Sequence, residues 1–339
     1  MTRKKAKLIF RIVLFLGTAI SLYFVPWILV KAWIWPLPDT IQEQVDEAIG
    51  YGFDGMIVYV DQAGKPPAFY TGGWKDRKNK IPADPKSLFK IASISKLYVA
   101  VAVTKLVKEK RLSLDQRLVD YFPELVGRIE YAEKITLRNM VQHRSGIPNF
   151  TDNPAFWENE QENGKKALDF ALDLPASFEP DDGYEYSNTN YLLLREIIYK
   201  VVGYSHEQYI KEKILIPLEL NNTFFSLKEV DLDNVMSGYY VGYEEDFKTN
   251  ENGMLATAED VGIFLRALND GSVFDEGEKE IYPYVYDHGG LVIGYQSLAE
   301  YHKDIDAVVV QFINTTDFNG YEWNLSEIII NRIVKILKK

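Results

Sequence analysis

Strand-like sequence occurs in only two parts of this chain, near its beginning and near its end, and this distribution limits the possible folds. The early part contains Phe53–Val60 and Pro67–Trp74, separated by the turn DQAGK, which predicts a hairpin. The late part contains Gly290–Ala299 and Ala307–Asn314. Most periodic stretches between the two parts are helical. A single sheet must therefore be assembled from both ends of the chain.

This order predicts an α+β fold, in which an antiparallel sheet is flanked by helices and interrupted by an inserted all-helical region. We expect the sheet region at about 39–111 and 256–339, and the helical region at about 112–255. Asp39 is the predicted N-cap of the first flanking helix. The helical patterns next to the strands are Thr40–Ile49, the run after Ser93, Thr257–Leu268 and Leu325–Leu337.

An apolar tract near the N-terminus predicts a membrane anchor. Ile12–Val30 carries no charge, and its length is close to that of a bilayer-spanning helix. Five bases precede the tract and only Lys31 follows closely, so the positive-inside bias places the N-terminus in the cytoplasm. We therefore predict that residues 1–38 form a basic cytoplasmic stub and a single-pass transmembrane helix, and that residues 39–339 form an extracytoplasmic domain.

A cleavable signal peptide is the alternative interpretation of the same tract. Small residues at Gly17 and Ala19 would suit a signal peptidase. Cleavage there would leave an apolar N-terminus, and the tract is long for a signal core, so we favour the uncleaved anchor.

The composition excludes several classes of function. The chain has no cysteine, which removes disulfides, thiolate catalysis and cysteine-ligated metals. Its four histidines form no metal-binding pair, so we predict no metal and no cofactor. A net charge of −11, with no basic patch beyond the N-terminus, argues against nucleic acid as a partner.

Two places match the pattern S-x-x-K, in which a lysine can activate a serine. Ser87 and Lys90 lie in a strand-like stretch, where residues three apart point to opposite faces. Ser93 and Lys96 open a helix, where residues three apart share a face. The apolar run LYVAVAV after Lys96 predicts a buried helix, and burial lowers the pKa of a lysine. Taken alone, Ser93 fits either a nucleophile or an ordinary helix cap.

Two further motifs suit the same chemistry. Tyr186-Ser187-Asn188 precedes a helix, where the tyrosine can act as a general acid and the asparagine can orient Lys96. His288-Gly289-Gly290 begins a strand, and its glycines permit close approach of the backbone to a ligand. The N–H groups of Leu291 and Ser93 are candidate oxyanion donors.

Together these motifs resemble the serine β-lactamase-like and penicillin-binding hydrolases, in particular the branch of class C β-lactamases, D-alanyl-D-alanine carboxypeptidases and family VIII esterases. The stretches FKIASISKLYVA, ITLRNMVQHRSGIP and FEPDDGYEYSNTNYLLL carry the resemblance. It implies that Ser93 is the acylated nucleophile, Lys96 its base and Tyr186 the partner in proton transfer. It also implies substrate contacts at Asn188, His288, Gly290 and Leu291.

One departure from the family pattern bears on the substrate. His288 stands where lactamases and transpeptidases have the lysine of K-T-G, so a charge that meets a substrate carboxylate is lost. With a pKa near about 6.5, this histidine would be only partly charged at neutral pH. The sequence therefore predicts an esterase- or peptidase-like enzyme acting on a small molecule or peptide with a hydrolysable carbonyl. A non-catalytic or slowly acylated binding module at the cell envelope is the alternative.

Overall fold

The computed structural model describes residues 3–159, 166–250 and 253–339. Its centre is a six-stranded antiparallel sheet with the strand order β3-β2-β1-β10-β9-β8, so both ends of the chain contribute to it, as predicted. The predicted α+β architecture is confirmed. The strands are β1 (Gly55–Gln62), β2 (Ala68–Asp76), β3 (Ile81–Pro82), β8 (His288–Val292), β9 (Tyr295–His302) and β10 (Ala307–Ile313).

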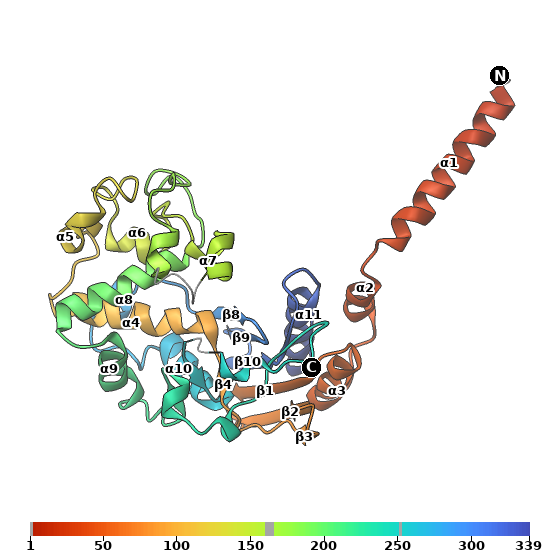
Figure 1. Cartoon of the computed structure of the whole chain (residues 1–339). Helices are drawn as coiled ribbons and strands as arrows, with labels where there is room; N and C mark the ends of the chain where they lie inside the picture. Colours follow the sequence, from red (N-terminus) through yellow and green to blue (C-terminus); the bar gives the residue numbers. More distant parts are fainter. Residues whose placement is uncertain (1–2, 160–165, 251–252) are drawn as a thin grey trace.

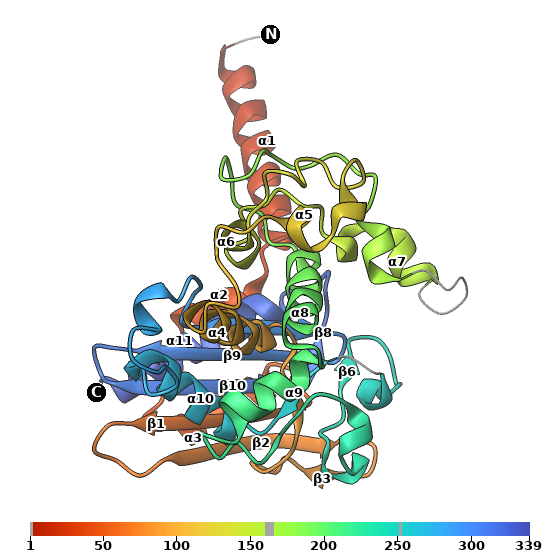
Figure 2. The same ribbon diagram turned by 90° about the vertical axis from the view of Figure 1, so that its left-hand side faces the viewer.

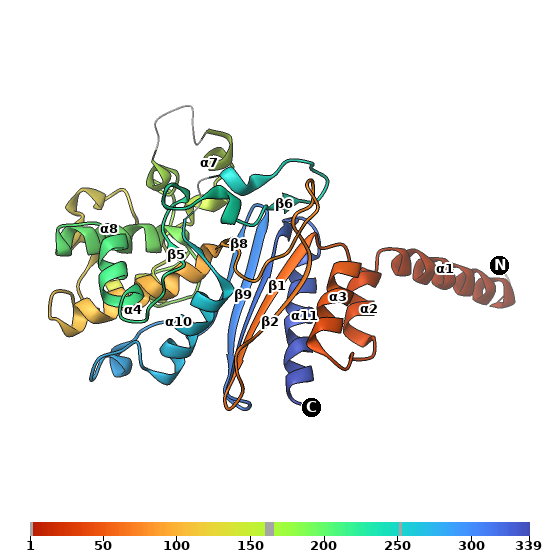
Figure 3. The same cartoon turned by 90° about the horizontal axis from the view of Figure 1, so that it is seen from below.

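Both faces of this sheet are covered by helices (Figure 3). Along β1, Met56 and Val58 pack into one apolar cluster, whereas Ile57 and Tyr59 pack into the other. This alternation follows from the two-residue period of a strand, and it explains why β1 is apolar almost throughout. The first cluster joins α2 (Trp27–Ile34), α3 (Ile41–Gly50) and α11 (Glu322–Leu337), and the second joins α4 (Ser95–Lys108) and α10 (Ala258–Asp270).

A helical region stands beside α4 on the second face (Figures 1 and 2). The region predicted to be all-helical, 112–255, also contains short strands, because its loops return to pair with each other and with the segment before α4. Its helices are α5 (Leu118–Tyr121), α6 (Leu137–Val141), α7 (Pro154–Asn159), α8 (Asn188–Val202) and α9 (His206–Ile210). Its short strands are β5 (Thr223–Phe224), β6 (Tyr239–Tyr240) and, at its end, β7 (Leu255–Ala256). Strand β7 pairs with β5 and with β4 (Phe89–Lys90), and β6 pairs with β11 (Thr315–Thr316).

Two local predictions are wrong. The N-cap of α3 is Thr40 rather than Asp39, since the Thr40 hydroxyl accepts from the Glu43 N–H and the Glu43 carboxylate accepts from the Thr40 N–H. The single strand predicted at Gly290–Ala299 is a hairpin of β8 and β9, because Gly294 takes a left-handed conformation (φ +81°) in a two-residue turn.

The apolar N-terminal tract is also divided. Helix α1 (Arg3–Tyr23) projects away from the rest of the chain (Figure 1) and is long and apolar enough to cross a bilayer, a property that signal sequences share. The predicted span Ile12–Val30 is not continuous. Pro26 separates α1 from α2, because proline cannot donate a helical hydrogen bond. Ala32 in α2 is fully buried in the cluster that joins α3 and α11. Met1 and Thr2 of the predicted stub lie outside the described residues.

Candidate active site

Ser93 lies in a short 3-10 turn, Ala92–Ile94, directly before α4, so it precedes the α-helix that the sequence predicted it to open. Ala92 has a positive φ of 48°, a conformation that is uncommon for a residue with a side chain. Such strain is often found at functional sites. The turn leaves Ser93 partly exposed, whereas Lys96, in the first turn of α4, is 4% exposed.

The structure brings four of the predicted side chains together. Lys96 Nζ lies 3.1 Å from Ser93 Oγ, and the Tyr186 hydroxyl donates to Ser93 Oγ at 2.7 Å. Lys96 Nζ also donates to Asn188 Oδ1 at 2.8 Å. Residues separated by about 90 positions in the sequence thus meet around one hydroxyl.

Two residues that the sequence analysis did not identify orient Asn188. The Asn188 side-chain amide donates to Asn149 Oδ1 at 3.3 Å and to Thr151 Oγ1 at 3.2 Å. Asn149 Oδ1 also accepts from the Asn188 backbone N–H at 3.0 Å. These two acceptors hold the NH2 group of the Asn188 amide, so that its oxygen is turned toward Lys96.

The environment sets complementary protonation states for the base and the acid. Burial, with a smaller contribution from the charge of Arg195, lowers the pKa of Lys96 to about 7. Burial also raises the pKa of Tyr186 to about 12, against the opposing effect of its hydrogen bond to Ser93. At neutral pH a substantial fraction of Lys96 is therefore an uncharged amine able to accept a proton, while Tyr186 keeps the proton it can donate.

A second hydrogen-bonded chain runs beside Tyr186 and includes a residue that the motifs did not reveal. The Tyr284 hydroxyl lies 3.2 Å from His143 Nε2 and 3.0 Å from His288 Nε2. The Ser187 N–H donates to His143 Nδ1, so the proton of His143 is on Nε2 and points at Tyr284. His288 Nδ1 donates to the Gly289 carbonyl, so its Nε2 accepts from Tyr284. The His143 ring stacks on Tyr186, with 4.5 Å between the centroids.

This arrangement changes the expected charge of His288. Burial, reinforced by the nearby charge of Lys96, lowers the pKa of His288 to about 4 in spite of the Gly289 hydrogen bond. The sequence-based value near about 6.5 is wrong for the folded chain. At neutral pH His288 is an uncharged imidazole, so the position of the family's lysine carries no positive charge here.

Strand β8 lies at the edge of the sheet, directly beside the turn that holds Ser93. A Cβ added at Gly290 would lie 2.2 Å from the Ile91 carbonyl oxygen, which is why only glycine fits there. Val292 pairs with Tyr295 across the two-residue turn, so Val292 and Gly290 form the hydrogen-bonded pairs with β9. The N–H of Leu291 therefore points outward from the free edge, as an oxyanion donor requires.

The competing S-x-x-K pair is not assembled as a site. Lys90 Nζ donates to the carbonyl oxygens of Phe247 and Asn250 at 2.9 and 2.6 Å. The buried Ser87 hydroxyl has no hydrogen-bond partner among the described residues. The sequence periodicity favoured Ser93 and Lys96 over Ser87 and Lys90, and in the structure only the first pair is in hydrogen-bond contact.

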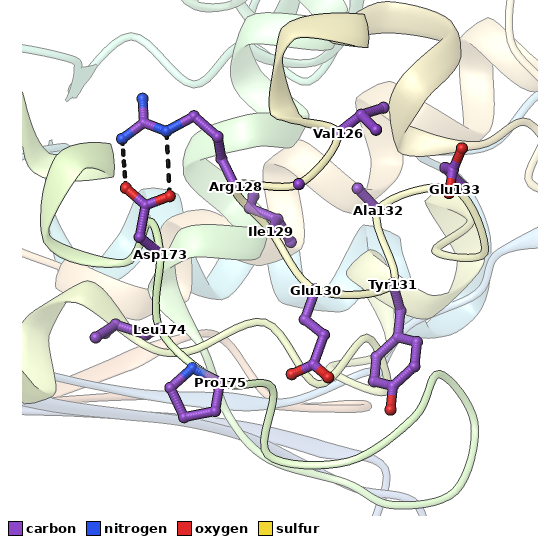
Figure 4. A pocket seen from close by; sticks show the side chains of 11 residues that line it. Val126, Arg128, Ile129, Glu130, Tyr131, Ala132, Glu133, Asp173, Leu174 and Pro175 are labelled. Carbon is purple, nitrogen blue, oxygen red and sulfur yellow. Dashed lines mark hydrogen bonds and ion pairs between the residues drawn. The ribbon is translucent and has the colours of Figure 1, made fainter.

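A hollow of about 510 Å³ lies elsewhere, in the helical region (Figure 4). It is lined by Val126–Glu133 and Asp173–Pro175. The Arg128 guanidinium in this lining is paired with both carboxylate oxygens of Asp173. It holds no serine or lysine. Among the described residues, no group of three or more histidine, aspartate or glutamate side chains is placed to hold a metal ion.

Comparison with known proteins gives a consistent family. The beta-lactamase family matches residues 37–288. Protein flp of Staphylococcus aureus (strain MW2) is 28% identical over 197 residues, which are 56% of this chain and 39% of that protein. Penicillin-binding protein 4* of Bacillus subtilis (strain 168) is 28% identical over 198 residues, 57% of this chain and 42% of that protein. The alignments span about two fifths of the length of these curated relatives.

Solved structures share the fold at lower sequence identity. D-amino acid amidase from Ochrobactrum anthropi SV3, complexed with L-phenylalanine amide, has a TM-score of 0.77 at 23% identity, covering 91% of this chain and 98% of that one. EstCE1, a hydrolase with promiscuous acyltransferase activity, has a TM-score of 0.69 at 18% identity, covering 91% of this chain and 98% of that one.

Proposed function

The chain belongs to the beta-lactamase family, and from this membership we propose that it is a serine hydrolase that works through an acyl-enzyme on Ser93. The observation that carries the proposal is the contact of one hydroxyl with both a low-pKa amine and a phenol, at 3.1 and 2.7 Å. A helix cap needs neither partner, so a capping role does not account for this arrangement.

Acylation follows from the positions of these groups. Ser93 Oγ attacks the substrate carbonyl carbon while its proton passes to the neutral amine of Lys96. The carbonyl oxygen becomes an oxyanion, which the N–H groups of Ser93 and Leu291 stabilise. Tyr186 then gives its phenolic proton to the leaving group as the scissile bond breaks, and the proton on Lys96 restores the phenol. Water releases the acid from Ser93 by the same steps in reverse order.

We propose esters and amides, rather than β-lactams, as the substrates that are turned over fastest. The uncharged His288 supports this, because it offers no cation to a carboxylate on the leaving-group side of the carbonyl. An amidase and a hydrolase with promiscuous acyltransferase activity have the same fold, and both fit such a substrate class. A chromogenic 4-nitrophenyl ester should therefore be turned over faster than a cephalosporin or a D-Ala-D-Ala peptide.

Active-site labelling tests the proposed chemistry. A fluorophosphonate probe should label the wild-type chain, and labelling should disappear in Ser93→Ala. The matched control is Ser87→Ala, which removes the serine of the competing motif and should leave labelling intact. A folded wild type that is not labelled would favour a binding module over an enzyme.

Substitution of His288 tests the proposed substrate class. His288→Lys places a cation where the imidazole is uncharged, so acylation by an anionic cephalosporin should rise at least tenfold relative to ester turnover. The ratio of the two kcat/KM values is the measurement. An unchanged ratio would mean that residue 288 does not determine the substrate class.

We also propose that α1 anchors the chain in a membrane, with the N-terminus in the cytoplasm and the hydrolase domain outside. Its apolar sequence and the lack of any covering element over the described side chains support this, since an apolar helix left in water would be unfavourable. The full chain should stay in the membrane fraction after a high-salt wash, whereas a chain that starts at Pro36 should be released. Recovery of a cleaved soluble form from cells would support a signal peptide instead.

A further inference from the structure

A cavity of about 290 Å³ opens beside the reactive hydroxyl. Ser93 and Lys96 are among the residues that line it, and Phe150, Leu192 and Leu291 contribute apolar side chains. Tyr186 is not among the described residues that line it. Because Tyr186 faces the leaving group in the proposed reaction, this cavity is placed to receive the acyl part of the substrate.

One wall of this cavity carries an arginine that no motif identifies. Arg195 follows Asn188 by seven residues on α8, two helical turns, so the two side chains share a face. Its Nη2 donates to Ser95 Oγ at 3.2 Å, two residues from the proposed nucleophile. Its charge also reaches Lys96, because it contributes to the low pKa of that amine.

The charge of Arg195 has no counter-ion within ion-pair distance in the described part of the chain. A guanidinium has five N–H donors, and here one hydroxyl accepts from them while Nε is buried without a partner. Glu207 acts on Arg195 only from a greater distance, and its carboxylate lies 3.3 Å from His206 Nδ1. Arg195 is half-buried, and a partly desolvated cation without a counter-ion is stabilised when an anion joins it.

We infer that Arg195 is a specificity-determining residue that binds an anionic group on the acyl part of the substrate. This inference rests on the proposed hydrolase function and narrows it to esters or amides whose acyl part is an apolar chain ending in a carboxylate. The apolar side chains of the cavity hold the chain, and the guanidinium forms a charge-assisted, bidentate contact with the carboxylate. His288 on β8 offers no positive charge to the leaving group. The substrate carboxylate is therefore bound by Arg195 on α8, on the acyl side of the scissile bond.

Two esters of equal chain length test the inference. They are the 4-nitrophenyl monoester of adipic acid, which carries a carboxylate, and 4-nitrophenyl hexanoate, which does not. The wild type should favour the adipate at least tenfold in kcat/KM. In Arg195→Gln this ratio should fall at least tenfold, and Arg195→Lys should restore part of it. Both esters are assayed at pH 8.5 with the same variant, so a change in the pKa of Lys96 affects both rates equally and cancels in the ratio.

Arg138→Gln is the matched control, because it removes the same charge from an exposed position and should leave the ratio unchanged. A wild type that favours hexanoate, or an Arg195→Gln variant with the wild-type ratio, would overturn the inference.

Binding to a chain that cannot turn over separates this inference from the proposed function. In Ser93→Ala, calorimetry should detect monophenyl adipate binding at least tenfold more tightly than phenyl hexanoate, and Arg195→Gln should abolish the difference. If the wild type cleaves neither ester but this difference is present, the hydrolase proposal fails and the anion site stands. If both esters are cleaved but the difference is absent, the anion site fails and the hydrolase stands.

Discussion

The protonation of Lys96 decides whether the site can act. Burial and, second, Arg195 lower its pKa to about 7, and only the neutral amine can accept the proton of Ser93. The kcat/KM for a neutral ester should therefore increase with pH, about tenfold per pH unit below pH 6, and level off above about pH 7. It should stay constant to pH 9, since Tyr186 keeps its proton over this range. A profile that is flat between pH 5.5 and 8 would remove Lys96 from the role of base.

The groups facing Lys96 explain why its pKa is not raised. The Tyr191 ring lies 5.5 Å from Nζ, Asn188 offers a neutral oxygen, and His288 is uncharged. No carboxylate in the described part of the chain forms an ion pair with the amine. The Arg195→Gln variant should accordingly show the same pH profile moved to higher pH, because a neighbouring cation has been removed.

Removing the Tyr284 hydroxyl should reduce both the stability and the activity of the protein. Tyr284→Phe leaves the proton of His143 and the lone pair of His288 without their partner, at a cost of about 1–3 kcal/mol. The melting temperature should drop by several degrees, and kcat/KM should fall about tenfold because His143 supports Tyr186 by stacking. Tyr286→Phe is the control and should change neither. Equal effects of the two substitutions would show that the hydroxyl is not a positioning group.

Strand β8 depends on the absence of a side chain at one position. Gly290→Ala places a Cβ 2.2 Å from the Ile91 carbonyl oxygen, so the strand must move away from the Ser93 turn and take the Leu291 N–H with it. Ester turnover should fall at least a hundredfold, the scale of losing one oxyanion donor. Gly50→Ala, where an added Cβ has open space, should keep full activity. Near-normal turnover in Gly290→Ala would argue against Leu291 as a donor.

Elements with a local signal were predictable from the sequence. The contrast between Ser87–Lys90 and Ser93–Lys96 could be drawn because strand and helix periods are local properties. The N-terminal and C-terminal strands were found for the same reason. The β8–β9 turn was missed because Ile293 and Gly294 interrupt an apolar run without any other turn residue.

Contacts between distant segments had no such signal. Tyr284 meets His143 across 141 residues, and nothing in the aromatic stretch around Tyr284 distinguishes it from packing. Arg195 lies on a helix whose periodicity predicts only an exposed charge. Motifs therefore located the reacting groups, whereas the groups that orient them or surround the substrate became visible only in the packing of distant segments against one another.

The assembled molecule should lose stability in mild acid. Folding holds His143, His206 and His288 in buried sites that lower their pKa values to about 3, 4 and 4, and burial is the main cause at each. In the unfolded chain a histidine has a pKa near about 6.5. Between those values the unfolded state binds more protons, so stability is greatest above about pH 6.5 and falls as the pH decreases toward 4.

Denaturant unfolding at pH 7.5, 6 and 5 measures this loss of stability. Each histidine contributes about 1.36 kcal/mol per pH unit below its unfolded pKa, so the free energy of unfolding should fall by a few kcal/mol by pH 5. Buried carboxyls such as Asp260, whose pKa burial raises, act in the opposite direction. The variant His206→Gln separates the contributions, because His206 lies outside the proposed site and its loss should reduce the pH slope without removing activity at pH 8. If stability were the same at pH 7.5 and 5 in the wild type and in His206→Gln alike, the fold would not hold this buried histidine neutral, and the same argument for the uncharged state of His288 would lose its support.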